Sequence, residues 1–172
     1  FDQEGEEISR RENVVNMILK SEVAAPLLRQ LEAAEGGEDY GELKKKADAN
    51  KDVQDYLKAL ENILPFQRKD FEGIFEAMDG YPVIVRLIDP PMHEFLPPRE
   101  ELLQEVTMLR CKGAKGKELE EKEYLLRVVE SLWETNPMLG LRGCRAGLMY
   151  PGLTEMQVQA IMEAAVNVKK NG

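Results

Sequence analysis

Residues 82–91 read Pro82-Val83-Ile84-Val85-Arg86-Leu87-Ile88-Asp89-Pro90-Pro91. A β-branched apolar run without polar alternation is typical of a strand that is buried on both faces of a parallel sheet. The preceding residues 71–78 carry apolar side chains at helical spacing, and Gly80 stands where a helix is expected to stop. A helix, a buried strand and a proline-rich loop in this order indicate an α/β fold.

Helical periodicity dominates the rest of the chain. We predict helices over about 6–20, at 27–31, from 53 to 64 with Pro65 ending that helix, around 102–109, from 119 to 133, and around 158–165. Thr154 and Gln157 have the spacing of a capping box, which predicts that the last helix opens there. Residues 136–140 could form a second, short strand.

Two strands cannot close a sheet, and a complete eight-stranded α/β barrel needs about 250 residues. The chain has 172 residues. We therefore expect the α/β class, in the form of a helix-rich partial TIM-type (β/α) barrel segment, with residues 1–172 as a single segment of one domain.

Charge and composition exclude several classes of protein. The formal net charge of −9 argues against a general binder of nucleic acid or of acidic membranes. No apolar run is long enough to span a membrane, and the acidic start is unlike a targeting signal. Because the sequence lacks an initiator Met, we expect it to begin inside a longer chain. Cys111 and Cys144 predict two reduced structural thiols and an intracellular, reducing compartment, cytoplasmic or organellar.

Two arginines are the candidate binding residues. Arg86 lies near the carboxyl end of the predicted strand. It therefore either pairs with an acid such as Asp89 or points toward the end of the α/β fold where ligands bind. Arg142 lies in the turn Gly140-Leu141-Arg142-Gly143, where a guanidinium could grip a phosphate or carboxylate. From the residues alone, the structural and the ligand-binding interpretations both stay open.

No catalytic residue and no metal ligand can be named from spacing. His93 is the single histidine, and a structural hydrogen bond is expected for it in preference to a role as general base, because no nucleophile or relay partner is evident. The acidic residues are scattered along helix faces, so they predict no metal site.

Two stretches closely resemble the pyruvate, phosphate dikinase family. They are Asp89-Pro90-Pro91-Met92-His93-Glu94-Phe95-Leu96-Pro97, with the residues from Pro65 leading to it, and Asn136-Pro137-Met138-Leu139-Gly140-Leu141-Arg142-Gly143-Cys144-Arg145. The resemblance implies an enzyme that interconverts pyruvate, ATP and phosphate with phosphoenolpyruvate, AMP and pyrophosphate through a phosphohistidine. It also implies that Arg86 and Arg142 bind phosphoenolpyruvate or pyruvate.

The resemblance carries further expectations about the parent enzyme. It implies a Mg²⁺-dependent homodimer, with a swivelling phosphohistidine domain and the rest of the barrel as partners of this segment. The metal ligands, the catalytic cysteine and the phosphohistidine are expected outside the chain, so the segment itself should be inactive. The family usually has His where Leu141 stands and Leu where Ala146 stands, and residues 21–62 resemble a helical insertion.

Two other functions stay open. A phosphoenolpyruvate synthase-like enzyme is disfavoured by the Asp-Pro-Pro-x-His-Glu-Phe signature. A non-catalytic helical binding module, built around residues 21–62, is the alternative from another class.

Overall fold

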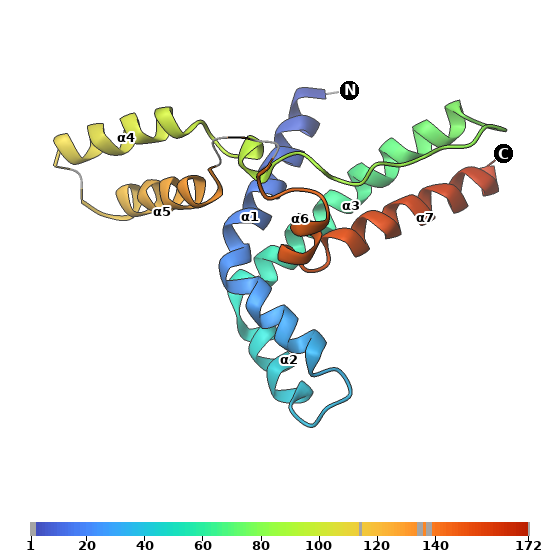
Figure 1. The fold of residues 1–172 in the computed structure, drawn as a ribbon, viewed down its shortest axis with the longest axis horizontal. Helices are drawn as coiled ribbons and strands as arrows, with labels where there is room; N and C mark the ends of the chain where they lie inside the picture. Colours follow the sequence, from blue (N-terminus) through green and yellow to red (C-terminus); the bar gives the residue numbers. More distant parts are fainter. Residues whose placement is uncertain (1–2, 114, 134–135, 137–138, 172) are drawn as a thin grey trace. The chain divides into compact units, whose positions relative to one another are not determined.

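The computed structural model describes residues 3–113, 115–133, 136 and 139–171, and its elements in this part of the chain are helices (Figure 1). They are α1 (Gln3–Ala33), α2 (Tyr40–Ala49), α3 (Lys51–Ala77), the 3₁₀ helix η1 (Met92–Phe95), α4 (Arg99–Cys111), α5 (Lys117–Leu132), α6 (Cys144–Met149) and α7 (Leu153–Asn171). The chain divides into two compact units, one formed by the residues up to Ile88 together with those from Cys144 onward, the other by Asp89–Gly143.

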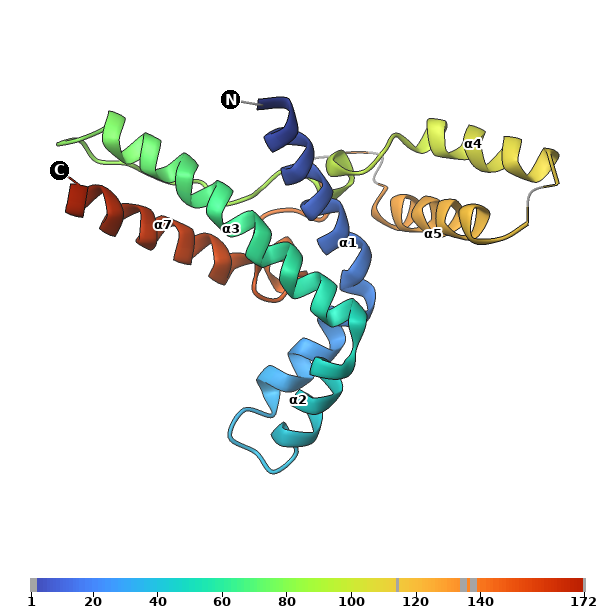
Figure 2. The ribbon, with the colours of Figure 1, turned by 180° about the vertical axis from the view of Figure 1, so that it is seen from behind.

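The first unit is built around α3. Helix α1 packs against α3, and α7 runs beside the later part of α3 (Figures 1 and 2). Asn50 caps the start of α3, because its Oδ1 accepts hydrogen bonds from the backbone N–H groups of Asp52 at 2.9 Å and Val53 at 3.4 Å. The apolar side of α3 is buried through Val53, Tyr56, Ala59, Leu60, Ile63 and Phe71.

The prediction that Pro65 ends a helix is wrong. Pro65 lies inside α3, and Pro26 likewise lies inside α1, so that segments expected as separate helices are continuous. A proline removes one backbone hydrogen bond from a helix interior. Burial on both sides of Pro65, at Ile63 and at Phe71, outweighs that local cost.

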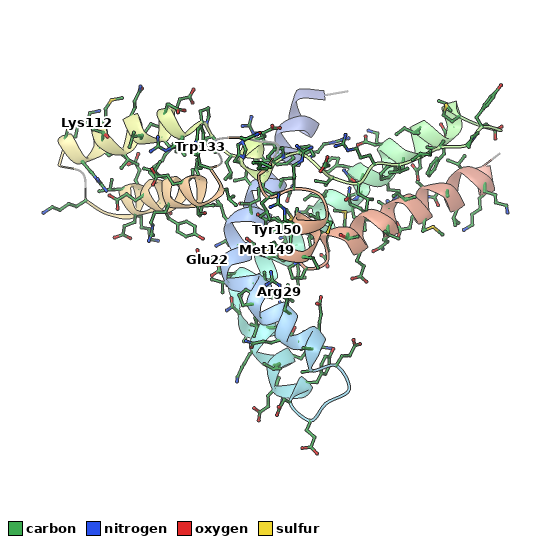
Figure 3. All side chains as sticks on the ribbon, viewed as in Figure 1. Glu22, Arg29, Lys112, Trp133, Met149 and Tyr150 are labelled. Carbon is green, nitrogen blue, oxygen red and sulfur yellow. The ribbon has the colours of Figure 1, made fainter. Side chains whose placement is uncertain are left out.

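A buried polar cluster lies where α6 meets α7. Tyr56 is 0% exposed, and its hydroxyl donates a hydrogen bond of 2.9 Å to the backbone oxygen of Pro151. Arg29 of α1 donates to the backbone oxygen of Met149 at 3.0 Å, and Figure 3 shows the labelled Arg29, Met149 and Tyr150 in the same region. These bonds connect α1 and α3 to the α6–α7 turn.

The predicted α/β barrel segment is also wrong, because the described residues contain helices and no strand. Residues 82–88 are extended but form no ladder, since the described part of the chain offers no neighbouring strand to pair with. Burial alternates along them: Val83 and Val85 are half-buried, whereas Ile84 is 98% exposed. The apolar run is therefore partly buried on one side and exposed to solvent on the other.

The predicted second strand, over 136–140, falls partly outside the described residues, at positions 137 and 138. Of the described residues in this stretch, Leu139 donates its backbone N–H to the backbone oxygen of Asn136 at 2.9 Å. Whether residues 21–62 are an insertion stays a prediction; they hold the end of α1, all of α2 and the start of α3.

The second unit is a helical hairpin with a short 3₁₀ turn before it. Helices α4 and α5 lie side by side (Figures 1 and 2). Both helices were predicted from the sequence. Gly113 and Gly116 adopt φ values of +68° and +131° between them, a left-handed backbone that favours glycine. Lys122 and Glu105 bridge the two helices at 2.6 Å.

Replacing Tyr56 by Phe tests the hydrogen bond between Tyr56 and the backbone oxygen of Pro151. The variant leaves the Pro151 oxygen without its phenolic donor, so the free energy of unfolding should fall by about 1–2 kcal/mol. Urea unfolding measures this change. Tyr81→Phe is the matched control, because Tyr81 is 73% exposed; an equal loss in both variants would contradict the assignment.

Alkaline pH should destabilise the first unit. Burial raises the pKa of Tyr150 from 10.0 to about 12, and burial raises the pKa of Tyr56 as well. Above about pH 10 the unfolded tyrosines lose protons that the folded ones keep, so stability falls as pH rises toward 12. Urea unfolding at about pH 9 and pH 11 should show this fall, and Tyr150→Phe should reduce it.

Candidate functional site

Arg86 lies in the extended segment that follows α3, and it belongs to the first unit. Val85 turns toward the helices, where it packs against the buried cluster of Phe71, Ala160 and Ala164. Side chains alternate along an extended backbone, so the neighbouring Arg86 takes the other side and is exposed. Burial of Val85 thereby determines which way Arg86 faces.

A buried glutamine fixes the end of the same segment. Gln157 of α7 is 4% exposed, and its Oε1 accepts a hydrogen bond of 3.1 Å from the backbone N–H of Ile88. Its amide nitrogen donates to Oε1 of Gln67 on α3 at 3.0 Å. The predicted capping box is therefore wrong: α7 begins at Leu153, before Thr154, and Gln157 binds other elements instead of its own helix start.

Arg142 forms a two-bond ion pair with Asp89 in the second unit. Its Nε donates to Oδ1 at 3.2 Å and its Nη2 donates to Oδ2 at 2.8 Å. The two side chains are only 20% and 22% exposed. Charge-assisted bonds in a fork are strong and directional, so this pair fixes the plane of the guanidinium.

The backbone around this pair is close-packed. Gly143 has a φ of +56°, and a Cβ added there would lie 3.1 Å from Oδ1 of Asp89. The backbone N–H of Met92 donates to the backbone oxygen of Leu141 at 3.4 Å, so the segments 89–92 and 141–143 lie side by side. Glycine at 143 satisfies both the backbone conformation and the space that the carboxylate needs.

Sequence reasoning found both arginines, but it missed two residues that orient them. The sequence pattern predicts Asp89 as a partner of Arg86 and Gln157 as part of a helix cap. The glycine beside Arg142 was the available signal for Asp89, since it marks a close approach. No local signal identifies Gln157 as the acceptor for Ile88, because the two are 69 residues apart.

The remaining candidates have ordinary surroundings. The His93 ring lies 6.2 Å from the Trp133 ring, centroid to centroid, in a tilted arrangement. Cys111 and Cys144 are free and exposed. Among the described residues, no three His, Cys, Asp or Glu side chains gather where a metal ion could bind, and no helix is long and apolar enough to cross a membrane.

Residues 20–171 match a family model described as "PEP-utilising enzyme, PEP-binding domain", in which PEP is phosphoenolpyruvate. This match covers most of the chain, including both arginines and Asp89. The chain belongs to this family of PEP-binding domains. The resemblance that the motifs carried is thereby confirmed at the level of the domain.

Curated relatives of this PEP-binding domain are dikinases. The chain is 51% identical over 115 residues to pyruvate, phosphate dikinase 1, chloroplastic, of Oryza sativa subsp. japonica. It is 52% identical over 116 residues to the chloroplastic enzyme of Mesembryanthemum crystallinum, and 51% identical over 116 residues to the chloroplastic enzyme 1 of Arabidopsis thaliana. These matches cover 67%, 66% and 66% of the chain but only 12%, 11% and 11% of the relatives.

Replacing Gln157 by Leu tests the anchor of the Arg86 segment. The variant leaves the Ile88 N–H and the Gln67 oxygen without this partner, which should cost about 1–3 kcal/mol of unfolding free energy. Hydrogen exchange at the Ile88 amide should also become faster. Gln159→Leu is the control on the same helix. Gln159 is exposed, so this variant should change the unfolding free energy by no more than about 0.5 kcal/mol.

Proposed function

We propose that this PEP-binding domain works within a pyruvate, phosphate dikinase. Such an enzyme interconverts pyruvate, ATP and phosphate with phosphoenolpyruvate, AMP and pyrophosphate through a phosphohistidine. The observation that carries the proposal is the identity of about half of the residues to named dikinases over two thirds of the chain. The synthase-like enzyme and the helical binding module gain no support from the comparisons.

Arg86 and Arg142 are the proposed binding residues for phosphoenolpyruvate and pyruvate. Both ligands carry a carboxylate, and phosphoenolpyruvate adds a phosphate, so fixed positive charge suits each of them. Support comes from the way each arginine is held. Val85 and Gln157 anchor the segment of Arg86, and Asp89 holds the guanidinium of Arg142.

In the proposed reaction the arginines bind and orient the substrate while a phosphohistidine elsewhere in the enzyme gives or takes the phosphoryl group. Positioning and electrostatic stabilisation supply most of the catalysis in phosphoryl transfer. A guanidinium beside the moving oxygens stabilises the negative charge that they carry. The two arginines are therefore assigned to binding and charge stabilisation.

The proposed parent enzyme depends on Mg²⁺, which supplies additional positive charge to the reacting oxygens when it is bound. We assign its ligands, the catalytic cysteine and the phosphohistidine to parts of the enzyme beyond this chain. The chain on its own supplies part of a binding site.

Substitution of either arginine in the full-length enzyme tests the function. Arg86→Ala and Arg142→Ala should each raise KM for pyruvate and for phosphoenolpyruvate by about 10- to 100-fold, since each removes charged hydrogen bonds of about 1.5–3 kcal/mol. Steady-state kinetics in both directions, with phosphate and pyrophosphate as co-substrates, measure the effect.

Arg110→Ala is the control for charge loss. Arg110 forms an exposed ion pair with Glu123 in the α4–α5 hairpin, so its removal should leave both KM values unchanged. Wild-type KM values in both Arg86→Ala and Arg142→Ala would reject the proposed binding role.

A further inference from the structure

The ion pair of Asp89 and Arg142 has a geometry that restricts the arginine more than a simple charge contact would. The bonds from Nε and Nη2 reach different carboxylate oxygens, at 3.2 and 2.8 Å. This side-on fork sets both the position and the plane of the guanidinium. With about one fifth of each side chain exposed, water competes weakly for the same groups.

The carboxylate is itself held by a stiff backbone. Asp89 is followed by Pro90 and Pro91, whose rings restrict φ. Beyond them, the Met92 N–H is bonded to the Leu141 oxygen, directly before Arg142. Gly143, directly after Arg142, leaves room for Oδ1 of Asp89. The fork is therefore supported from the backbone on both of its sides.

We propose that Asp89 is a positioning residue for substrate binding: its carboxylate holds the Arg142 guanidinium in the orientation that receives the anionic substrate. This inference rests on the proposed function, in which Arg142 binds phosphoenolpyruvate or pyruvate. A long arginine side chain samples many rotamers when it is unrestrained. Holding it in place before the substrate arrives removes that ordering step from binding.

A competing role for Asp89 would have the opposite effect on affinity. If the carboxylate occupied the place of the substrate, binding would require breaking the fork, and removal of Asp89 would tighten binding. The two bonds to Asp89 engage two of the five N–H groups that a guanidinium carries. In the positioning role, by contrast, the fork orients the arginine, and removal of Asp89 weakens binding.

The test is a double-mutant cycle in the full-length enzyme, with Asp89→Ala, Arg142→Ala and the double variant. KM and kcat for pyruvate are measured, with phosphoenolpyruvate binding followed separately at equilibrium. We expect Asp89→Ala to raise KM by about tenfold when Arg142 is present, and to add less than about twofold when Arg142 is absent. The KM of Asp89→Asn, which keeps one oxygen acceptor, should lie between those of wild type and Asp89→Ala. This variant replaces Asp89→Ala in the cycle if the Ala variant does not fold.

The control is Glu130→Ala, which breaks an exposed ion pair with Arg99 in the same unit and should leave KM unchanged. Equal effects of Asp89→Ala with and without Arg142 would overturn the positioning role, because a merely structural carboxylate acts independently of the arginine. A lower KM in Asp89→Ala would also overturn it, in favour of competition. If Arg142→Ala alone leaves KM unchanged, the proposed binding role of Arg142 fails first, and the inference fails with it.

Discussion

Burial of α3 on two sides is the constraint on which the first unit depends. It packs against both α1 and α7, so one helix connects segments from both ends of the sequence. Tyr56 and Phe71 are both buried, and each removes a large apolar surface from water. The interior proline of α3 is tolerated because this burial holds the helix on either side of it.

The extended segment after α3 depends on those same helices. It has no strand ladder in the described structure, so its position comes from Val85 in the apolar cluster and from the Gln157 bond to the Ile88 backbone. Gln157 also reaches Gln67, which joins α3, α7 and the segment through one buried amide. A residue of another helix in this way helps to decide where the segment carrying Arg86 lies.

Part of this arrangement could be predicted from the sequence. Apolar spacing predicted the helical regions. The motifs around Arg86 and Arg142 indicated the correct family, whereas anion binding by these two arginines stays a prediction. The predicted strand over 82–88 failed because β-branched composition reports a preference for extended backbone, whereas a strand also requires a partner. The helix stop at Pro65 failed because local propensity was weaker than tertiary burial.

The sequence by itself determined the helix-forming segments, the glycine-flanked turn at Arg142 and the domain family, since these depend on local residue chemistry and spacing. Only the tertiary structure decided which partners the polar side chains take. Asp89 is 53 residues from Arg142, and Gln157 is 69 residues from Ile88. Hydrogen bonds and ion pairs act over a few ångströms, so the fold must bring such residues together before either can orient the other.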